Sequence, residues 1–84
     1  MTFEFDPAKA RANLRKHGVS FAHAEQALRD PMAFTIEDPD SRDEERFVTL
    51  GIDALVVIHT QRGERTRVIS ARKASRGEAD RYYA

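Results

Sequence analysis

Arginine, histidine, serine and threonine are concentrated in the segment from Ile58 to Lys73, in the second half of the chain. Cleavage of RNA without a metal needs such a set. A base removes the 2′-hydroxyl proton, an acid protonates the leaving 5′ oxygen, and cations stabilise the phosphorane. His59 titrates near neutral pH and is therefore a candidate acid or base. Arg67 and Arg72 are candidate ligands of the scissile phosphate, because a planar guanidinium fits phosphate oxygens. We expect His59, Arg67 and Arg72 to converge on one face or edge of the sheet, close enough to contact a single phosphate.

The general base need not be a histidine, since Glu45 or a desolvated Lys73 can also accept the proton. His59 follows an apolar run, so a hydrogen bond within the core is an alternative role for it. Tyr82 most simply anchors the last helix, although a tyrosine ring can also stack on a base. These residues point to a nucleic-acid partner. They leave open whether the chain is a nuclease or a basic binding module.

The sequence lacks the signatures of several other kinds of site. It has no cysteine, which excludes disulfides and thiolate metal sites. It has neither a phosphate-binding glycine loop nor a nucleophile elbow. Its three histidines, His17, His23 and His59, do not have the close spacing of a metal cage. We therefore expect neither a metal nor another cofactor.

The net charge is zero, but the charges are sorted along the chain. Residues 8–17 hold four bases and no acid, and residues 59–81 hold seven bases against three acids. Two basic segments around an acidic one predict a localised surface that binds a polyanion. The additional substrate-binding candidates are Lys9, Lys16, Arg65 and Lys73.

The acidic segment, residues 37–45, holds six acids and a single base, Arg42. Acids and a proline without other apolar residues predict a mobile, solvent-exposed loop. Glu45 is the expected exception, because it stands at the start of a predicted strand.

Capping signals define the helices. Asp6 followed by Pro7 predicts a helix that ends at Gly18. Ser20 predicts the start of a second helix, which stops before Asp30-Pro31. Ser75 and Glu78 have the spacing of a capping box, which predicts a third helix near the end of the chain.

Alternating and apolar runs predict the strands, at residues 3–5, 33–37, 45–52, 54–60 and 65–71. The fourth run is continuously apolar and is expected to be a central strand buried on both faces. Strict alternation would put Arg65 and Arg67 on one strand face with Ile69, and Ser70 on the other. Short turns between the later strands predict an antiparallel meander with the helices packed on one face.

The chain of 84 residues has room for one domain, residues 1–84, of the α+β class. Its longest apolar run, Ala54 to Ile58, is too short to cross a bilayer, and no apolar signal segment follows the acidic start. We therefore expect a cytoplasmic protein that does not interact with membranes.

Several strings together resemble the BrnT toxin family, over nearly the whole chain and in the family's order. They are Phe3-Glu4-Phe5-Asp6-Pro7-Ala8-Lys9-Ala10, Asn13, Lys16-His17-Gly18-Val19-Ser20-Phe21, Asp30-Pro31, Glu45-Arg46-Phe47, Gly51, Val57-Ile58-His59-Thr60 and Arg67-Val68-Ile69-Ser70-Ala71-Arg72-Lys73-Ala74. The family usually has tryptophan where Phe5 and Phe47 stand here, and both changes keep an aromatic residue.

The resemblance implies a RelE-like fold and a type II toxin that cleaves RNA without a metal and stops translation. It also implies a BrnA-like antitoxin with a ribbon-helix-helix domain, and operator DNA that is bound only through the complex. The functional positions carried over from the family are Glu45, Arg46, His59, Arg67, Arg72 and Tyr82. Two alternatives are a catalytically inactive partner of the antitoxin that acts as co-repressor, and an RNA-binding protein that is not a toxin.

Overall fold

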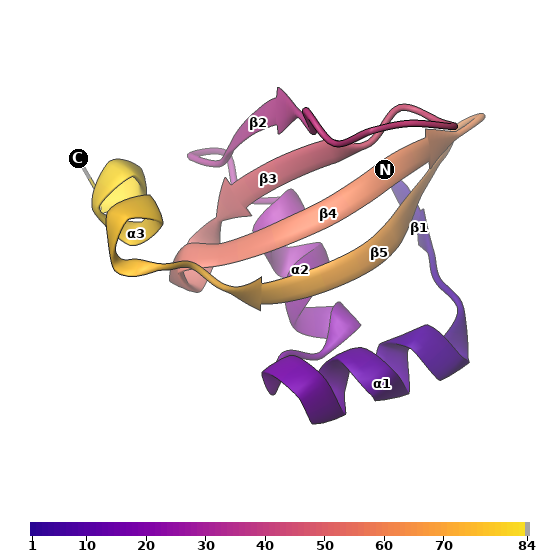
Figure 1. Ribbon diagram of the computed structural model, residues 1–84, viewed down its shortest axis with the longest axis horizontal. Helices are drawn as coiled ribbons and strands as arrows, with labels where there is room; N and C mark the ends of the chain where they lie inside the picture. Colours follow the sequence, from indigo (N-terminus) through magenta and orange to yellow (C-terminus); the bar gives the residue numbers. More distant parts are fainter. Residues whose placement is uncertain (84) are drawn as a thin grey trace.

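The computed structural model describes residues 1–83, which form three α-helices, one 3₁₀ helix and a five-stranded sheet (Figure 1). Their order is β1 (Thr2–Glu4), α1 (Pro7–His17), α2 (Phe21–Leu28), β2 (Phe34–Glu37), β3 (Phe47–Gly51), η1 (Ile52–Ala54), β4 (Leu55–Arg62), β5 (Arg65–Lys73) and α3 (Arg76–Tyr83). The predicted α+β class and every predicted element are confirmed, with boundaries shifted by at most two residues.

The sheet has the strand order β1-β5-β4-β3-β2 and is mixed. Strands β2 to β5 form the predicted antiparallel meander. The prediction of a purely antiparallel sheet is wrong at one edge, where β1 pairs with β5 in parallel, for example Glu4 with Arg67. No hairpin connects these two strands, so turn lengths gave no information about their relative direction.

The predicted helix signals act as expected. The Asp6 side chain accepts a hydrogen bond from the Ala8 N–H, and Gly18 ends α1 in the left-handed region at φ 70°. Ser20 accepts a hydrogen bond from the His23 N–H at the start of α2. These caps fix the ends of the two helices, of which α2 lies behind the sheet and α1 below β5 in Figure 1.

The hydrophobic core lies between the sheet and these two helices. Val57 of β4, Val68 of β5 and Ala24 of α2 are buried together there. We call this side of the sheet the covered face. The other side, the open face, bears Val48, Leu50 and Val56, beside α3. The prediction that all helices pack on one face is therefore wrong for α3, which lies at the open face (Figure 1).

A bulge in β5 changes which residues share a face. Ile58 pairs with Ser70 while the next residue, His59, pairs with Val68, so Ile69 is the extra residue. The alternation restarts beyond the bulge, and Arg67, Ser70 and Arg72 all lie on the open face. The expectation that Ser70 points away from Arg67 is wrong for this reason.

Among residues 1–83, no helix is both long enough and apolar enough to cross a bilayer.

Candidate functional site

The two strand arginines lie on the open face, and each is paired with a carboxylate of this chain. Arg67 Nη1 lies 3.6 Å from Glu4 Oε2, across the parallel edge. Arg72 donates from Nη1 and Nη2 to the two oxygens of Glu78, at 2.8 and 3.0 Å. Both predicted phosphate ligands share the expected face, but their charge is already compensated.

Glu78 joins Arg72 to the start of α3. Its carboxylate also accepts a hydrogen bond of 2.8 Å from the Ser75 N–H, and its own N–H donates to Ser75 Oγ. The predicted capping box is thus confirmed. The hydrogen bonds from Arg72 and Ser75 lower the pKa of Glu78 to about 2, while the bond with Glu78 raises the pKa of Arg72. The pair therefore stays charged over the whole neutral range.

His59 lies on the covered face, away from both strand arginines. Its Nε2 is 2.7 Å from Thr49 Oγ1, which in turn lies 2.6 Å from Thr35 Oγ1. Its ring stacks on Phe47, with centroids 5.8 Å apart. Burial lowers the pKa of His59, so the neutral form prevails at pH 7. The expectation that His59 and Arg67 converge on one phosphate is wrong, because the bulge puts them on opposite faces.

Tyr82 is held at the end of α3. Its hydroxyl donates to the carboxylate of Asp30, in the turn after α2, and this bond raises the pKa of Tyr82 to about 12. This contact anchors the last helix, which is the simpler of the two roles considered for Tyr82.

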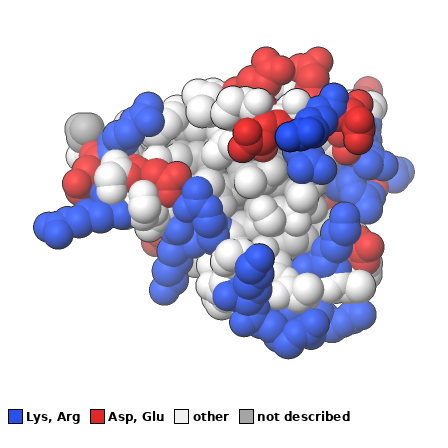
Figure 2. Space-filling view, in the orientation of Figure 1, with Lys and Arg blue, Asp and Glu red and all other residues white. Residues whose placement is uncertain are grey.

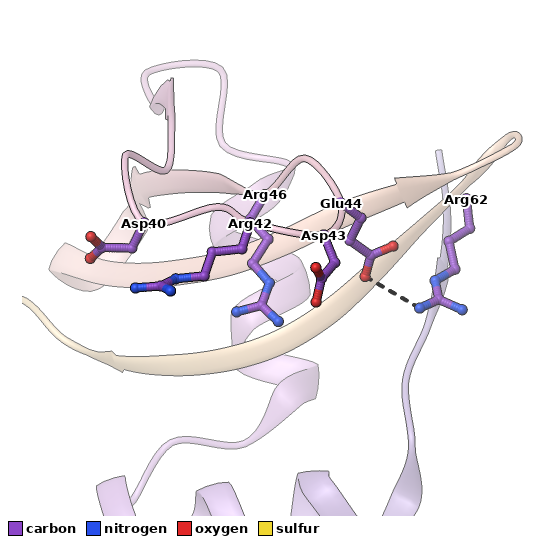
Figure 3. A pocket seen from close by; sticks show the side chains of 6 residues that line it. All are labelled: Asp40, Arg42, Asp43, Glu44, Arg46 and Arg62. Atoms are coloured by element: carbon purple, nitrogen blue, oxygen red, sulfur yellow. Dashed lines mark hydrogen bonds and ion pairs between the residues drawn. The ribbon is translucent and has the colours of Figure 1, made fainter.

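A second group of arginines comes from the acidic loop and the end of β4. The side chains of Arg42 and Arg46 extend over β4 and β5, on the side away from α2 (Figure 3). With Arg62 they line a hollow of about 510 Å³, whose other lining residues are Asp40, Asp43 and Glu44. Arg62 is paired with Glu44 at 3.4 Å. Within residues 1–83, neither Arg42 nor Arg46 has an ion-pair partner. A phosphate could approach these two without displacing a carboxylate.

This arginine hollow adjoins a second one. The second hollow has a volume of about 270 Å³ and is lined by Glu44, Glu45, Phe47, Thr60 and Gln61. Glu44 lines both. The Glu45 side chain is exposed, so the expectation that it is the buried exception of the acidic loop is wrong; β3 begins two residues later. Exposure of most of the loop is confirmed.

The other predicted substrate ligands are spread around the molecule. Lys9 and Lys16 are exposed on α1, which packs against β5. Arg65 and Lys73 are exposed at opposite ends of β5. Both basic and acidic side chains surround the uncharged centre of the open face (Figure 2).

The sequence pattern did not indicate Arg42, Glu44 or Arg62 as site residues. Arg42 was visible as the only base in a nine-residue acidic segment. Arg62 is the last residue of β4, and the pairing of β4 with β3 brings it near Glu44. No group of three or more histidine, cysteine, aspartate or glutamate side chains arranged to hold a metal ion occurs in the part of the chain described, residues 1–83.

Comparisons with known proteins agree with the fold. A family model described as "Ribonuclease toxin, BrnT, of type II toxin-antitoxin system" matches residues 5–78. The crystal structure of the Brucella abortus ribonuclease toxin BrnT is similar, with a TM-score of 0.66 and 31% sequence identity. That match covers 90% of this chain and 99% of the other. A search of curated proteins gave no match.

Proposed function

Since the chain belongs to the BrnT family of ribonuclease toxins of type II toxin-antitoxin systems, we propose that it cleaves RNA without a metal and so inhibits translation. A BrnA-like antitoxin neutralises it. The observation that carries the proposed site is the pair Arg42 and Arg46. These arginines extend over the open face and have no carboxylate partner within residues 1–83 (Figure 3).

In this proposal Arg42 and Arg46 bind the scissile phosphate and stabilise the extra negative charge of the phosphorane. Two guanidinium groups supply the donors in a planar arrangement that fits phosphate oxygens. The strand arginines add little positive potential, because Glu4 and Glu78 compensate their charge.

Glu44 is the proposed general base, which removes the 2′-hydroxyl proton. The 2′ oxygen attacks the phosphorus, the bond to the 5′ oxygen breaks, and water protonates the leaving 5′ oxygen. The ribose joins the base to the 3′ phosphate, so its 2′-hydroxyl lies between the two groups. Glu44 lines both the arginine hollow, where we place the phosphate, and the second hollow, where we place the base. It therefore lies where the 2′-hydroxyl is expected. Arg62 holds its carboxylate from one side at 3.4 Å. This role replaces the assignment of base function to His59, whose Nε2 is engaged by Thr49 on the other face.

The test is cleavage of a defined RNA by purified protein, with cut sites located by primer extension in the presence of a chelator. The double variant R42A/R46A should cleave at least about 100-fold more slowly, which is typical for loss of transition-state charge stabilisation. The matched control is R11A/R15A, which removes two exposed arginines from α1. Equal loss in both variants would show that only net charge matters and would overturn the site.

The antitoxin is proposed to cover the open face with an acidic segment that folds on binding. Opposite charges mainly accelerate association, while apolar contacts supply most of the affinity. The half-exposed Phe34 and Ile36 are suitable apolar contacts. The association rate should therefore fall as salt rises from about 50 to 500 mM, with little change in dissociation. A constant association rate would place the antitoxin elsewhere.

A second function, a catalytically inactive partner of the antitoxin, is favoured by one observation. Both strand arginines are paired with carboxylates, and His59 lies on the other face. Induced expression separates the two functions. Growth arrest that R42A/R46A abolishes supports the toxin, whereas unimpaired growth with stable protein supports the inactive partner.

A further inference from the structure

We propose that the second hollow is a guanine-binding subsite, in which Phe47 stacks on the base and Glu45 recognises its Watson–Crick edge. The inference rests on the proposed function in one respect: the arginine hollow beside it receives the 3′ phosphate of the same nucleotide. It adds a substrate preference that the ribonuclease assignment does not contain.

Phe47 is a suitable stacking platform because its position is fixed. It is the first residue of β3, where it pairs with Glu37 on one side and His59 on the other. Its ring packs against the His59 ring at an interplanar angle of 29°. A ring held in this way loses little freedom when a base stacks on it. His59 is thus a positioning residue for the platform.

Glu45 supplies the hydrogen-bond acceptors. Its backbone carbonyl accepts a bond of 2.6 Å from Thr60 Oγ1, which fixes the residue at the wall of the hollow. Within residues 1–83, the structure gives its carboxylate no hydrogen bond and no ion pair. Its two oxygens are therefore available to a ligand that presents two adjacent donors.

Guanine is the base that meets this requirement. Its Watson–Crick edge presents N1–H and the N2 amino group side by side, so both carboxylate oxygens receive a hydrogen bond. Adenine and cytosine present one amino group next to an acceptor nitrogen, which a carboxylate repels. Uracil presents one N–H between two carbonyl oxygens. The other polar donors of this hollow, Thr60 and Gln61, already donate to the carbonyls of Glu45 and Gly63. The Glu45 carboxylate therefore selects guanine by pairing and by repulsion.

The charges of the two hollows fix the orientation of the nucleotide. The second hollow has two carboxylates and no cation among its lining residues, so a phosphate is repelled from it. Arg42, Arg46 and Arg62 stand in the adjoining hollow. Phe47 lies with His59 on the covered face, whereas Arg42 and Arg46 lie over the open face, and the two hollows share Glu44 where β3 begins. In this proposal the nucleotide passes around the start of β3, with its base at Phe47 and its phosphate at the arginines. The ribose then lies at Glu44.

The test is calorimetric titration of the whole protein with the four 3′ nucleoside monophosphates. We expect 3′-GMP to bind about tenfold more tightly than 3′-AMP, 3′-CMP or 3′-UMP, the order expected of one bidentate contact. E45Q should reduce this preference to about twofold. E37Q, an exposed glutamate on β2 that lines neither hollow, is the matched control and should retain it.

A further variant, F47L, should weaken all four nucleotides because it removes the stacking surface while keeping an apolar residue in β3. Equal affinities for the four nucleotides, or a preference that E45Q leaves intact, would overturn the guanine subsite. Failure of the proposed function has a different signature. A protein that prefers 3′-GMP through Glu45 but leaves RNA intact has the subsite without the nuclease activity.

Discussion

The two faces of the sheet differ in how closely they are packed. On the covered face a Cβ added at Gly51 would lie 2.4 Å from the Ala27 carbonyl oxygen, so β3 and α2 leave no room there for a side chain. On the open face Phe34 and Ile36 remain 37% and 54% exposed, and charged side chains surround them. The covered face stabilises the domain, and the open face is left free to bind.

The arginines also divide into a group that stabilises the fold and a group that is free to bind a ligand. Arg67 and Arg72, on β5, are paired with Glu4 and Glu78 and help to hold β1 and α3. Arg42 and Arg46 stand on or beside a loop that adds no core residue. Substitutions should therefore affect either folding or RNA chemistry, depending on the region.

The largest effect on stability is expected for Asn13, the buried polar residue of α1. Its Nδ2 donates to the carbonyls of Val19 and Ala71, and its Oδ1 accepts from the Ala71 N–H. N13A leaves these buried groups without partners and should lower the free energy of unfolding by about 3 kcal/mol. Urea denaturation of both proteins measures this change in the free energy of unfolding.

Leu14→Ala is the matched control, since this neighbour in α1 is 51% exposed. Its effect should stay below about 1 kcal/mol. Equal losses in both variants would show that the covered face is not the main source of the protein's stability.

The next effect concerns rate. R46A should reduce RNA cleavage about 100-fold, equivalent to about 2.7 kcal/mol of transition-state stabilisation. R67A should reduce it only a few-fold, because Glu4 already compensates Arg67. Both are measured as kcat/KM on the same RNA, with unfolding curves to verify the fold. A reversed order would assign the phosphate to the strand arginines.

Most of the fold could be predicted because its signals are local. Asp6, Gly18 and Ser20 act through hydrogen bonds and dihedral angles within a few residues, so the sequence alone locates both helices. The direction of β1 could not be predicted, because it depends on Glu4 meeting Arg67 across more than sixty positions of sequence.

The candidate site was less predictable because of a single residue. Ile69 is the extra residue of the bulge, and it moves Ser70 and Arg72 to the face of Arg67 while His59 remains opposite. No signal in the run from Val68 to Ala71 marks that irregularity. The role of Arg42 depends on how the acidic loop folds over the sheet, which alternation does not describe.

A smaller effect is expected for the pH dependence of stability. Burial lowers the pKa of His59 below 6.5, its ordinary value. The unfolded chain therefore takes up a proton first, and the free energy of unfolding falls as the pH drops below about 6.5. H59Q should remove this component, while H17Q at the end of α1 is the histidine control. If the free energy of unfolding of H59Q depended on pH between 7 and 5 as it does in the parent protein, the buried position of His59 would be contradicted.

The smallest effect is expected for Glu78, whose pKa of about 2 lies below the unfolded value of 4.5. The ion pair with Arg72 therefore stabilises the protein fully above about pH 4.5, and this contribution is lost as the pH falls towards 2. E78Q should remove it. The loss at pH 7 should be only about 0.5 kcal/mol, because water screens a half-exposed pair.

E78Q also leaves the positive charge of Arg72 uncompensated on the open face. RNA affinity measured by fluorescence anisotropy should rise at low salt and return to the parent value at high salt, because one more positive charge then faces the polyanion. D80N, an exposed acid on the same helix, is the control for net charge. An equal rise in both variants would mean that Arg72 reaches no RNA, and that its pairing with Glu78 serves only to hold α3.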